Sequence, residues 1–175
     1  NSPATVEQNI KVRDVSFWDI ENPVLYTLIT VVKGSGTSDS QSTRVGFRDI
    51  MFEASKGFFL NGKNIKLKGI CMHHDAGCLG TAVPKEEISR RLDILKELGC
   101  NAIRTSHNPF SVDFLDLCDQ KGFLVIDEAF DEWELPKKKW LEGWNAGTPG
   151  KDGYAADFEE WGRRDLRDFI LRDRN

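Results

Sequence analysis

Polar side chains able to bind or react follow directly after three short apolar segments of the chain. All three histidines are among them, with His73 and His74 after the first segment and His107 after the second. Asp127 and Glu128 follow the third. Imidazole and carboxylate groups brought together can bind a polar substrate, hold a metal ion or transfer protons. Their common position predicts a shared functional cleft.

The spacing argues against a zinc site. A set of four ligands would comprise Cys71, His73, His74 and Cys78. On a strand, residues 71 and 73 share one face while residue 74 points to the other, and no second ligand pair follows. The metal interpretation is therefore disfavoured.

Two catalytic arrangements are also disfavoured by sequence adjacency. Asp127 and Glu128 are neighbours on a strand and face opposite ways, so they cannot flank one scissile bond as a general acid and base. Ser106 and His107 are adjacent too, which rarely gives the geometry of a nucleophilic triad, and no G-x-S-x-G turn is present. Hydrogen-bonding roles are the favoured interpretation.

The first part of the chain has the pattern of antiparallel strands. Residues 25–32 are β-branched and aromatic, a polar turn-forming cluster follows at 33–40, and a second strand is predicted over 41–50. Helical periodicity begins only after residue 80. This pattern predicts the last hairpin of a β-sandwich. Asn61-Gly62 between apolar flanks predicts a further, tight hairpin.

From residue 65 the pattern changes to alternating strands and helices. Strands are predicted over 65–71, 102–105 and 123–127, and helices over 84–98, 111–121 and 156–172. The inward positions predicted for the three helices are Ile88, Leu92, Leu95 and Leu98, then Phe114, Leu115 and Cys118, then Phe158, Trp161, Leu166, Phe169 and Ile170. Such alternation predicts a parallel sheet, and without glycine-rich phosphate loops a barrel is favoured over an open doubly wound sheet. Barrel active sites lie at the C-terminal ends of the strands, where the polar residues stand.

Composition excludes several classes of partner. The chain has 39% hydrophobic and 30% charged residues and a net charge of -4, as in soluble globular proteins. No apolar run approaches the roughly 18 residues of a membrane-spanning helix, and no basic face would bind nucleic acid. The four cysteines lack C-x-x-C spacing and are interpreted as buried free thiols.

The segment from Trp133 to Tyr154 is rich in Gly, Pro, Lys and Trp and predicts a long functional loop. Trp133, Trp140 and Trp144 could stack on sugar rings through their apolar faces, or could simply pack the loop. The sequence leaves both interpretations open.

Several motifs in register closely resemble glycoside hydrolase family 2. They are Arg44-Val45-Gly46-Phe47-Arg48, Phe59-Leu60-Asn61-Gly62-Lys63, Lys66-Leu67-Lys68-Gly69-Ile70, His73-His74-Asp75, the run from Asn101 to Pro109, and Asp127-Glu128-Ala129. The resemblance implies that residues 1–52 are the C-terminal part of an immunoglobulin-like β-sandwich. Residues 53–175 would then hold the first three β/α units of a (β/α)8 TIM barrel. An open three-stranded α/β module is the alternative.

The resemblance also implies a set of substrate-binding residues. They are His73, Asp75, Arg104, His107, Asn108 and Glu128. The family's two catalytic glutamates, an acid/base and a nucleophile, have no counterpart here and are expected beyond residue 175, so this chain alone should be inactive. No cofactor is implied, although Glu132 stands near a position that helps to hold magnesium in some relatives, and Trp133 and Glu134 depart from that metal-binding pattern.

The motifs around residues 106–109 and 127–133 look most like those of bacterial β-galactosidases. The implied activity is retaining hydrolysis of terminal β-galactosides, with a carbohydrate as the ligand. β-Glucuronidase, β-mannosidase and a non-catalytic carbohydrate-binding module remain alternatives. Homo-oligomerisation and the cellular compartment are not readable from the sequence.

Overall fold

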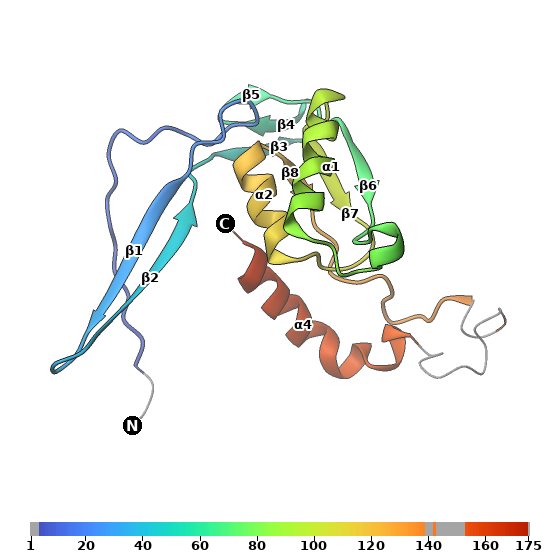
Figure 1. The fold of residues 1–175 in the computed structure, drawn as a ribbon. Coiled ribbons are helices and arrows are strands. Elements are labelled where there is room, and N and C mark those ends of the chain that lie inside the picture. The colour runs from blue at the N-terminus through green and yellow to red at the C-terminus, as the bar shows by residue number, and fades with distance from the viewer. Residues whose placement is uncertain (1–3, 139–141, 143–152, 175) are drawn as a thin grey trace.

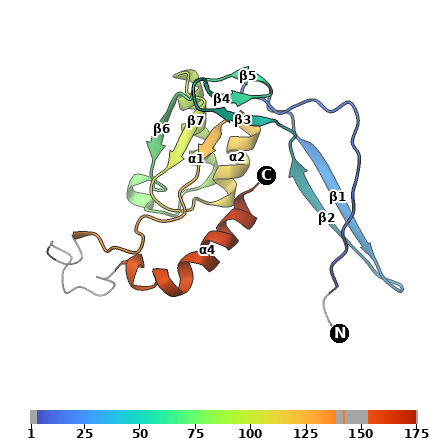
Figure 2. The same ribbon diagram turned by 180° about the vertical axis from the view of Figure 1, so that it is seen from behind.

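The computed structural model describes residues 4–138, 142 and 153–174, in which antiparallel strands precede parallel β/α units (Figure 1). Strands β1 (Tyr26–Lys33) and β2 (Ser38–Val45) form a long antiparallel hairpin, paired from Tyr26↔Val45 to Lys33↔Ser38. The hairpin projects away from the remaining elements in both views (Figure 2).

The predicted second strand over 41–50 is wrong in its bounds. β2 ends at Val45, because the chain then turns to place Gly46 against the Trp18 side chain, and the Trp18 N–H donates to the Phe47 carbonyl at 2.8 Å. Ile50 instead opens a separate strand, β3 (Ile50–Glu53). The prediction had merged two strands into one.

A small second sheet contains β3, β4 (Gly57–Leu60) and β5 (Lys63–Asn64) in the order β3-β4-β5. Asn61 and Gly62, at φ 50° and 77°, form the turn between β4 and β5, with Leu60 paired to Lys63. Positive φ at both central residues is what a two-residue hairpin with a type I′ turn requires. The hairpin prediction is confirmed.

The third sheet is parallel and has the order β6-β7-β8, with strands at Gly69–Met72, Ala102–Thr105 and Leu124–Ile126. Helices α1 (Lys85–Glu97) and α2 (Val112–Lys121) connect the strands and lie together on one face of the sheet. Two short 3₁₀ turns, Gly77–Leu79 and Tyr154–Ala156, and helix α4 (Phe158–Asp173) complete the described elements. The predicted alternation of parallel strands and helices is confirmed.

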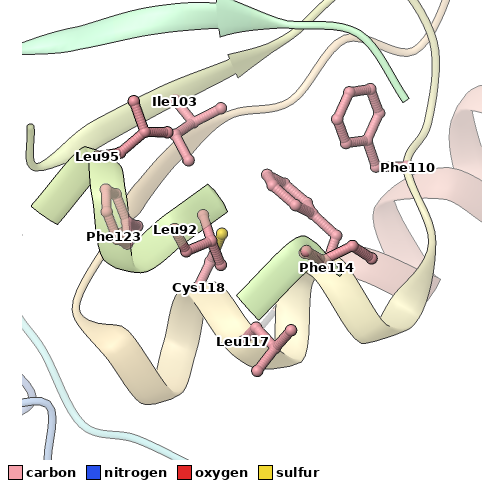
Figure 3. Close-up of a cluster of buried hydrophobic side chains, with 9 residues drawn as sticks. Leu92, Leu95, Ile103, Phe110, Phe114, Leu117, Cys118 and Phe123 are labelled. Carbon is pink, nitrogen blue, oxygen red and sulfur yellow. The ribbon is translucent and has the colours of Figure 1, made fainter. Parts of the chain in front are cut away.

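The main core lies between the parallel sheet and helices α1 and α2 (Figure 3). Its buried members are Ile88, Leu92, Leu95, Ile103, Phe110, Phe114, Leu117, Cys118 and Phe123. Leu98, predicted to face inward, is 74% exposed because it is the C-cap of α1 and lies past the last packed turn.

A second cluster ties the chain before the hairpin to the parallel sheet. It contains the buried residues Trp18, Ile20, Leu60, Ala102 and Leu124. The Trp18 indole N–H donates to the Asp119 carbonyl at 2.7 Å, and the Lys96 ammonium donates to the Ile20 carbonyl at 2.6 Å. Residues around 18–20 are thereby fixed against α1 and α2.

Two other predictions about burial are corrected. Cys118 is buried, but Cys71 and Cys78 are exposed and Cys100 is intermediate, so the four free thiols do not share one environment. On α4, Trp161 and Ile170 are 40% and 50% exposed, because little of the described chain packs against that face. Among the described residues no helix is both long and apolar enough to cross a membrane.

Candidate functional site

The candidate site begins at the C-terminal ends of β7 and β8, where alternate residues face opposite sides of the sheet. Ile103 and Val125 point toward α1 and α2 and join the main core. Arg104, the next residue on β7, therefore lies on the other face, and Glu128 has the same parity beyond β8. The pleat of the two strands thus brings a guanidinium and a carboxylate to one side.

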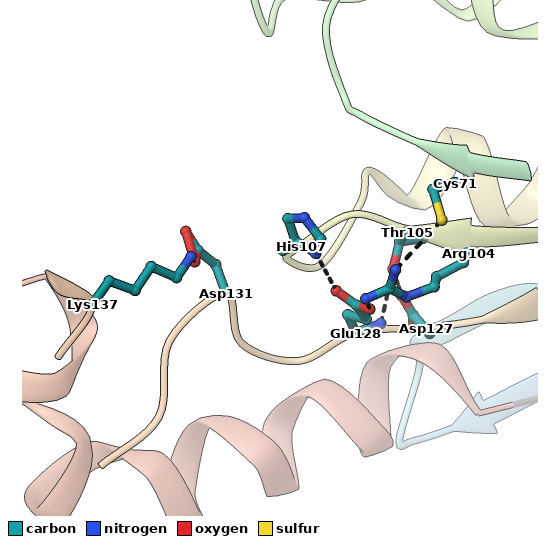
Figure 4. A network of polar contacts seen from close by, with 8 residues as sticks. All are labelled: Cys71, Arg104, Thr105, His107, Asp127, Glu128, Asp131 and Lys137. Atoms are coloured by element: carbon teal, nitrogen blue, oxygen red, sulfur yellow. Dashed lines mark hydrogen bonds and ion pairs between the residues drawn. The ribbon is translucent and has the colours of Figure 1, made fainter. Parts of the chain in front are cut away.

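Glu128 is the centre of a polar network on that side (Figure 4). One carboxylate oxygen, Oε1, forms an ion pair with Arg104 Nη2, and the other, Oε2, lies 2.9 Å from His107 Nδ1. Arg104 Nη1 also lies 3.4 Å from the Cys71 sulfur on β6. These contacts, led by the one to Cys71, raise the pKa of Arg104. Three neighbouring strands therefore contribute to one network.

The other residues predicted for the site lie around this network. The His73 ring is 5.6 Å from the His107 ring, edge to face. Asp75 is exposed, and its main-chain carbonyl accepts from Arg91 on α1 at 2.5 Å. Asn108 is exposed and lines a hollow of about 500 Å³ together with Phe130 and Tyr154. The structure thus joins Arg104, His107 and Glu128 directly.

His74 does not belong to this group. Its ring packs against Phe110 at 5.0 Å between centroids. Burial, followed by the nearby Arg91 charge, lowers the pKa of His74. His74 thus packs the loop after β6 against Phe110.

Asp127 points away from Glu128, as adjacency predicts, and accepts a hydrogen bond from Thr105 Oγ1 at 2.9 Å. Burial raises the pKa of Asp127 to about 6; the Thr105 hydroxyl acts in the opposite direction, and the nearby Asp173 carboxyl raises it further. The two adjacent carboxyl groups therefore have different environments and different partners.

Glu132 does not fit the magnesium site that the family resemblance suggests. Its side chain is buried at 4% exposure, and its two oxygens accept from the backbone N–H groups of Lys137 at 2.5 Å and Ala155 at 3.3 Å. Glu134 is exposed, and the described residues contain no cluster of His, Cys, Asp and Glu able to hold a metal. Glu132 instead joins the two ends of the loop that follows β8.

Trp133 is 56% exposed and contacts Phe130 and Phe158 at ring distances of 5.2 and 5.6 Å. Its aromatic neighbours support a packing role, while its exposed surface leaves room for a ligand. Trp140 and Trp144, the other two tryptophans predicted in this loop, lie outside the described residues.

Sequence reasoning missed two contributors to the network, Cys71 and Thr105. Cys71 was considered only as a metal ligand, and Thr105 only as part of a buried strand. The position of Thr105 at the end of β7, directly before Ser106-His107, was the available signal. A hydroxyl buried at a strand end needs a polar partner, and here that partner, Asp127, directly follows the next strand, β8.

Antiparallel strands that lead into parallel β/α units, with polar side chains at the strand ends, are characteristic of TIM-barrel enzymes with a preceding β domain. Residues 53–139 match the profile described as "Glycosyl hydrolases family 2, TIM barrel domain", and residues 1–48 match "Glycosyl hydrolases family 2". The chain belongs to glycoside hydrolase family 2.

Individual relatives agree with this assignment. The chain is 51% identical to a β-galactosidase from Bacteroides ovatus over 169 residues, which are 96% of this chain and 18% of that protein. It is 39% identical to a putative β-glucuronidase from Formosa agariphila over 95% of this chain and 15% of that protein. A solved β-glycosidase structure from Bacteroides vulgatus has a TM-score of 0.80 and 44% identity, covering 91% of this chain and 19% of that one. The chain therefore spans less than a fifth of the length of these relatives.

Proposed function

We propose that the protein carrying this chain hydrolyses terminal β-galactosides with retention of configuration. In this proposal residues 53–175 supply the first three β/α units of the catalytic barrel, and residues 1–52 supply the end of an immunoglobulin-like domain. The acid/base and the nucleophile are glutamates outside the 175 residues. The chain contributes the sugar-binding residues His73, Asp75, Arg104, His107, Asn108 and Glu128.

The observation that carries the proposal is the network of Arg104, Glu128 and His107 at the ends of two parallel strands, with His73 beside it. Its members are part-exposed, with side-chain exposures of 42% for Arg104, 44% for His107 and 19% for Glu128. Guanidinium groups donate, carboxylates accept, and imidazole can do either. Sugar hydroxyls both donate and accept, so this mixed set suits a polyhydroxylated ligand.

Charge pairing at the site favours a neutral sugar. Arg104 is paired with Glu128, and Arg91, near Asp75, is paired with Glu87. A uronic acid brings a carboxylate that is best bound by a cation without a competing carboxylate. The described part of the site therefore supports a neutral galactoside, in line with the activity named for the Bacteroides ovatus relative.

β-Glucuronidase is the second candidate. It is supported by the name of the Formosa agariphila relative, which is 39% identical over nearly the same residues. Residues that read individual sugar hydroxyls can lie on other strands of the barrel, where the two activities would differ.

A panel of nitrophenyl glycosides separates these activities. The natural polypeptide, expressed from its own start codon to its own stop codon, would be assayed with the β-galactoside, β-glucuronide, β-mannoside and β-glucoside. We expect the β-galactoside to give the highest kcat/KM, and a higher value for the β-glucuronide would replace the proposal by the second candidate. Absence of hydrolysis with all four would favour a non-catalytic carbohydrate-binding module.

A further inference from the structure

We propose that Thr105 is a positioning residue for the sugar-binding site, acting through the backbone of Glu128. The inference rests on the proposed function, because it concerns the same site. It adds a residue with no direct access to the ligand, since Thr105 is fully buried at 0% exposure.

The Thr105 hydroxyl makes two hydrogen bonds to neighbouring residues beyond β8. It donates to Asp127 Oδ1 at 2.9 Å and accepts from the Glu128 backbone N–H at 2.8 Å. A hydroxyl has one proton to donate and lone pairs to accept, so both bonds form at once. The donor direction is fixed because a backbone N–H cannot accept.

These bonds lie where the strand ladder between β7 and β8 stops. The last paired residues are Arg104 and Ile126, so the positions of Asp127 and Glu128 are not set by strand pairing. The hydrogen bonds of the Thr105 hydroxyl connect the two chain segments one step beyond the last pair of the ladder. They thereby fix the backbone from which the Glu128 side chain projects.

The side chain of Glu128 depends on that backbone position. Its oxygens contact Arg104 and His107, which both lie on the β7 side of the site. Carboxylate contacts of this kind lose strength steeply when the distance or angle changes. Movement of the Glu128 backbone would therefore break the contacts of its carboxylate with both the Arg104 guanidinium and the His107 imidazole.

Asp127, the second partner of the Thr105 hydroxyl, supports the same arrangement. Its carboxylate accepts the Thr105 proton, which leaves the hydroxyl lone pairs directed at the Glu128 N–H. Polar chains of this type polarise each member and resist reorientation. Thr105 and Asp127 together hold Glu128 from the face of the sheet opposite to the ligand.

The test uses Thr105→Val and Thr105→Ser in the natural polypeptide. Valine has nearly the same shape but no hydroxyl, and serine keeps the hydroxyl and loses the methyl group. Crystal structures of both variants would be compared with kcat and KM for nitrophenyl β-galactoside, measured well below the melting temperature of each variant. If the valine variant does not fold, Thr105→Cys replaces it, since a thiol is a weaker donor and acceptor.

We expect Thr105→Val to lower kcat/KM by about tenfold, mainly through KM, while Thr105→Ser stays within about twofold of the parent. In the valine crystal structure the contacts of Glu128 to Arg104 and His107 should be broken. A valine variant with a lower melting temperature but unchanged kcat/KM, or with both Glu128 contacts intact, would overturn the proposal. If the parent cleaves no glycoside, the proposed function fails, and the position of Glu128 in the valine structure still decides the role of Thr105.

Discussion

Gly122 and Gly99 form a matched pair for testing how the chain before the hairpin docks on the parallel sheet. Both follow the C-terminus of a helix, and both have positive φ, at 73° for Gly122 and 82° for Gly99. A Cβ atom at Gly99 would meet nothing within 4 Å, whereas one at Gly122 would lie 2.3 Å from the Ile20 carbonyl oxygen. The two alanine variants therefore share the backbone strain and differ in the clash.

The expected costs follow from these two terms. Left-handed backbone costs an alanine about 1 to 2 kcal/mol, which sets the effect of Gly99→Ala. Gly122→Ala adds about 1 to 3 kcal/mol, because the Ile20 backbone must move within a packed cluster. We therefore expect Gly122→Ala to be the more destabilising variant by at least about 1 kcal/mol.

Urea unfolding followed by tryptophan fluorescence measures the difference in the natural polypeptide. Trp18 is 3% exposed and packs in the same cluster as Ile20, so the part of the fluorescence change that Trp18→Phe abolishes reports on this contact. Equal midpoints for the two variants would show that Ile20 does not lie against Gly122, and would refute the docking described for residues around 18–20.

Three further predictions concern the site. Glu128→Gln should lower kcat/KM by about tenfold, because it removes the negative charge that pairs with Arg104. The control is Glu53→Gln, which breaks an exposed ion pair in the small sheet and should leave kcat/KM unchanged in the same assay. Glu132→Gln should lower the melting temperature, because each oxygen of Glu132 accepts from a backbone N–H group and the amide nitrogen of glutamine cannot accept; an unchanged melting temperature would contradict this role of Glu132. Burial raises the pKa of Asp127 to about 6 from an ordinary 3.8, so between about pH 4 and 6 the folded state retains a proton that the unfolded state has lost, and stability falls as pH rises. Asp127→Asn should remove this loss of stability, which is worth about 1 to 2 kcal/mol after solvent screening. The measurement is the change in melting temperature between about pH 4.5 and 7.5, and an equal change in the variant and the parent would contradict the prediction.

Much of the fold was predictable because local patterns determine it. The strand at 102–105 is found at the predicted residues, and α1 and α2 begin one residue after their predicted starts, where Pro84 and Ser111 serve as N-caps. Helical periodicity indicates which side of a helix is apolar, but not whether another element covers that side. The exposed positions on α4, such as Ile170, show the difference.

The sequence predicts which polar residues stand at the strand ends, but not which of them contact one another. Adjacency indicated that Asp127 and Glu128 face opposite ways, and they have separate partners in the structure. The choice of those partners depends on the register between β7 and β8, in which Arg104 pairs with Ile126. The sequence alone does not give that register, and the contacts of the Thr105 hydroxyl to Asp127 and Glu128 depend on it.

The most direct test of the central claim is a crystal structure of the natural polypeptide treated with an activated 2-deoxy-2-fluoro-β-galactoside. A retaining enzyme forms a covalent glycosyl intermediate, and fluorine at the 2-position slows its release. We expect a galactosyl group linked to a glutamate outside these 175 residues, with hydroxyls within hydrogen-bond distance of the Arg104, His107 and Glu128 network. A sugar bound away from that network, or linked to a residue of this chain, would contradict the account.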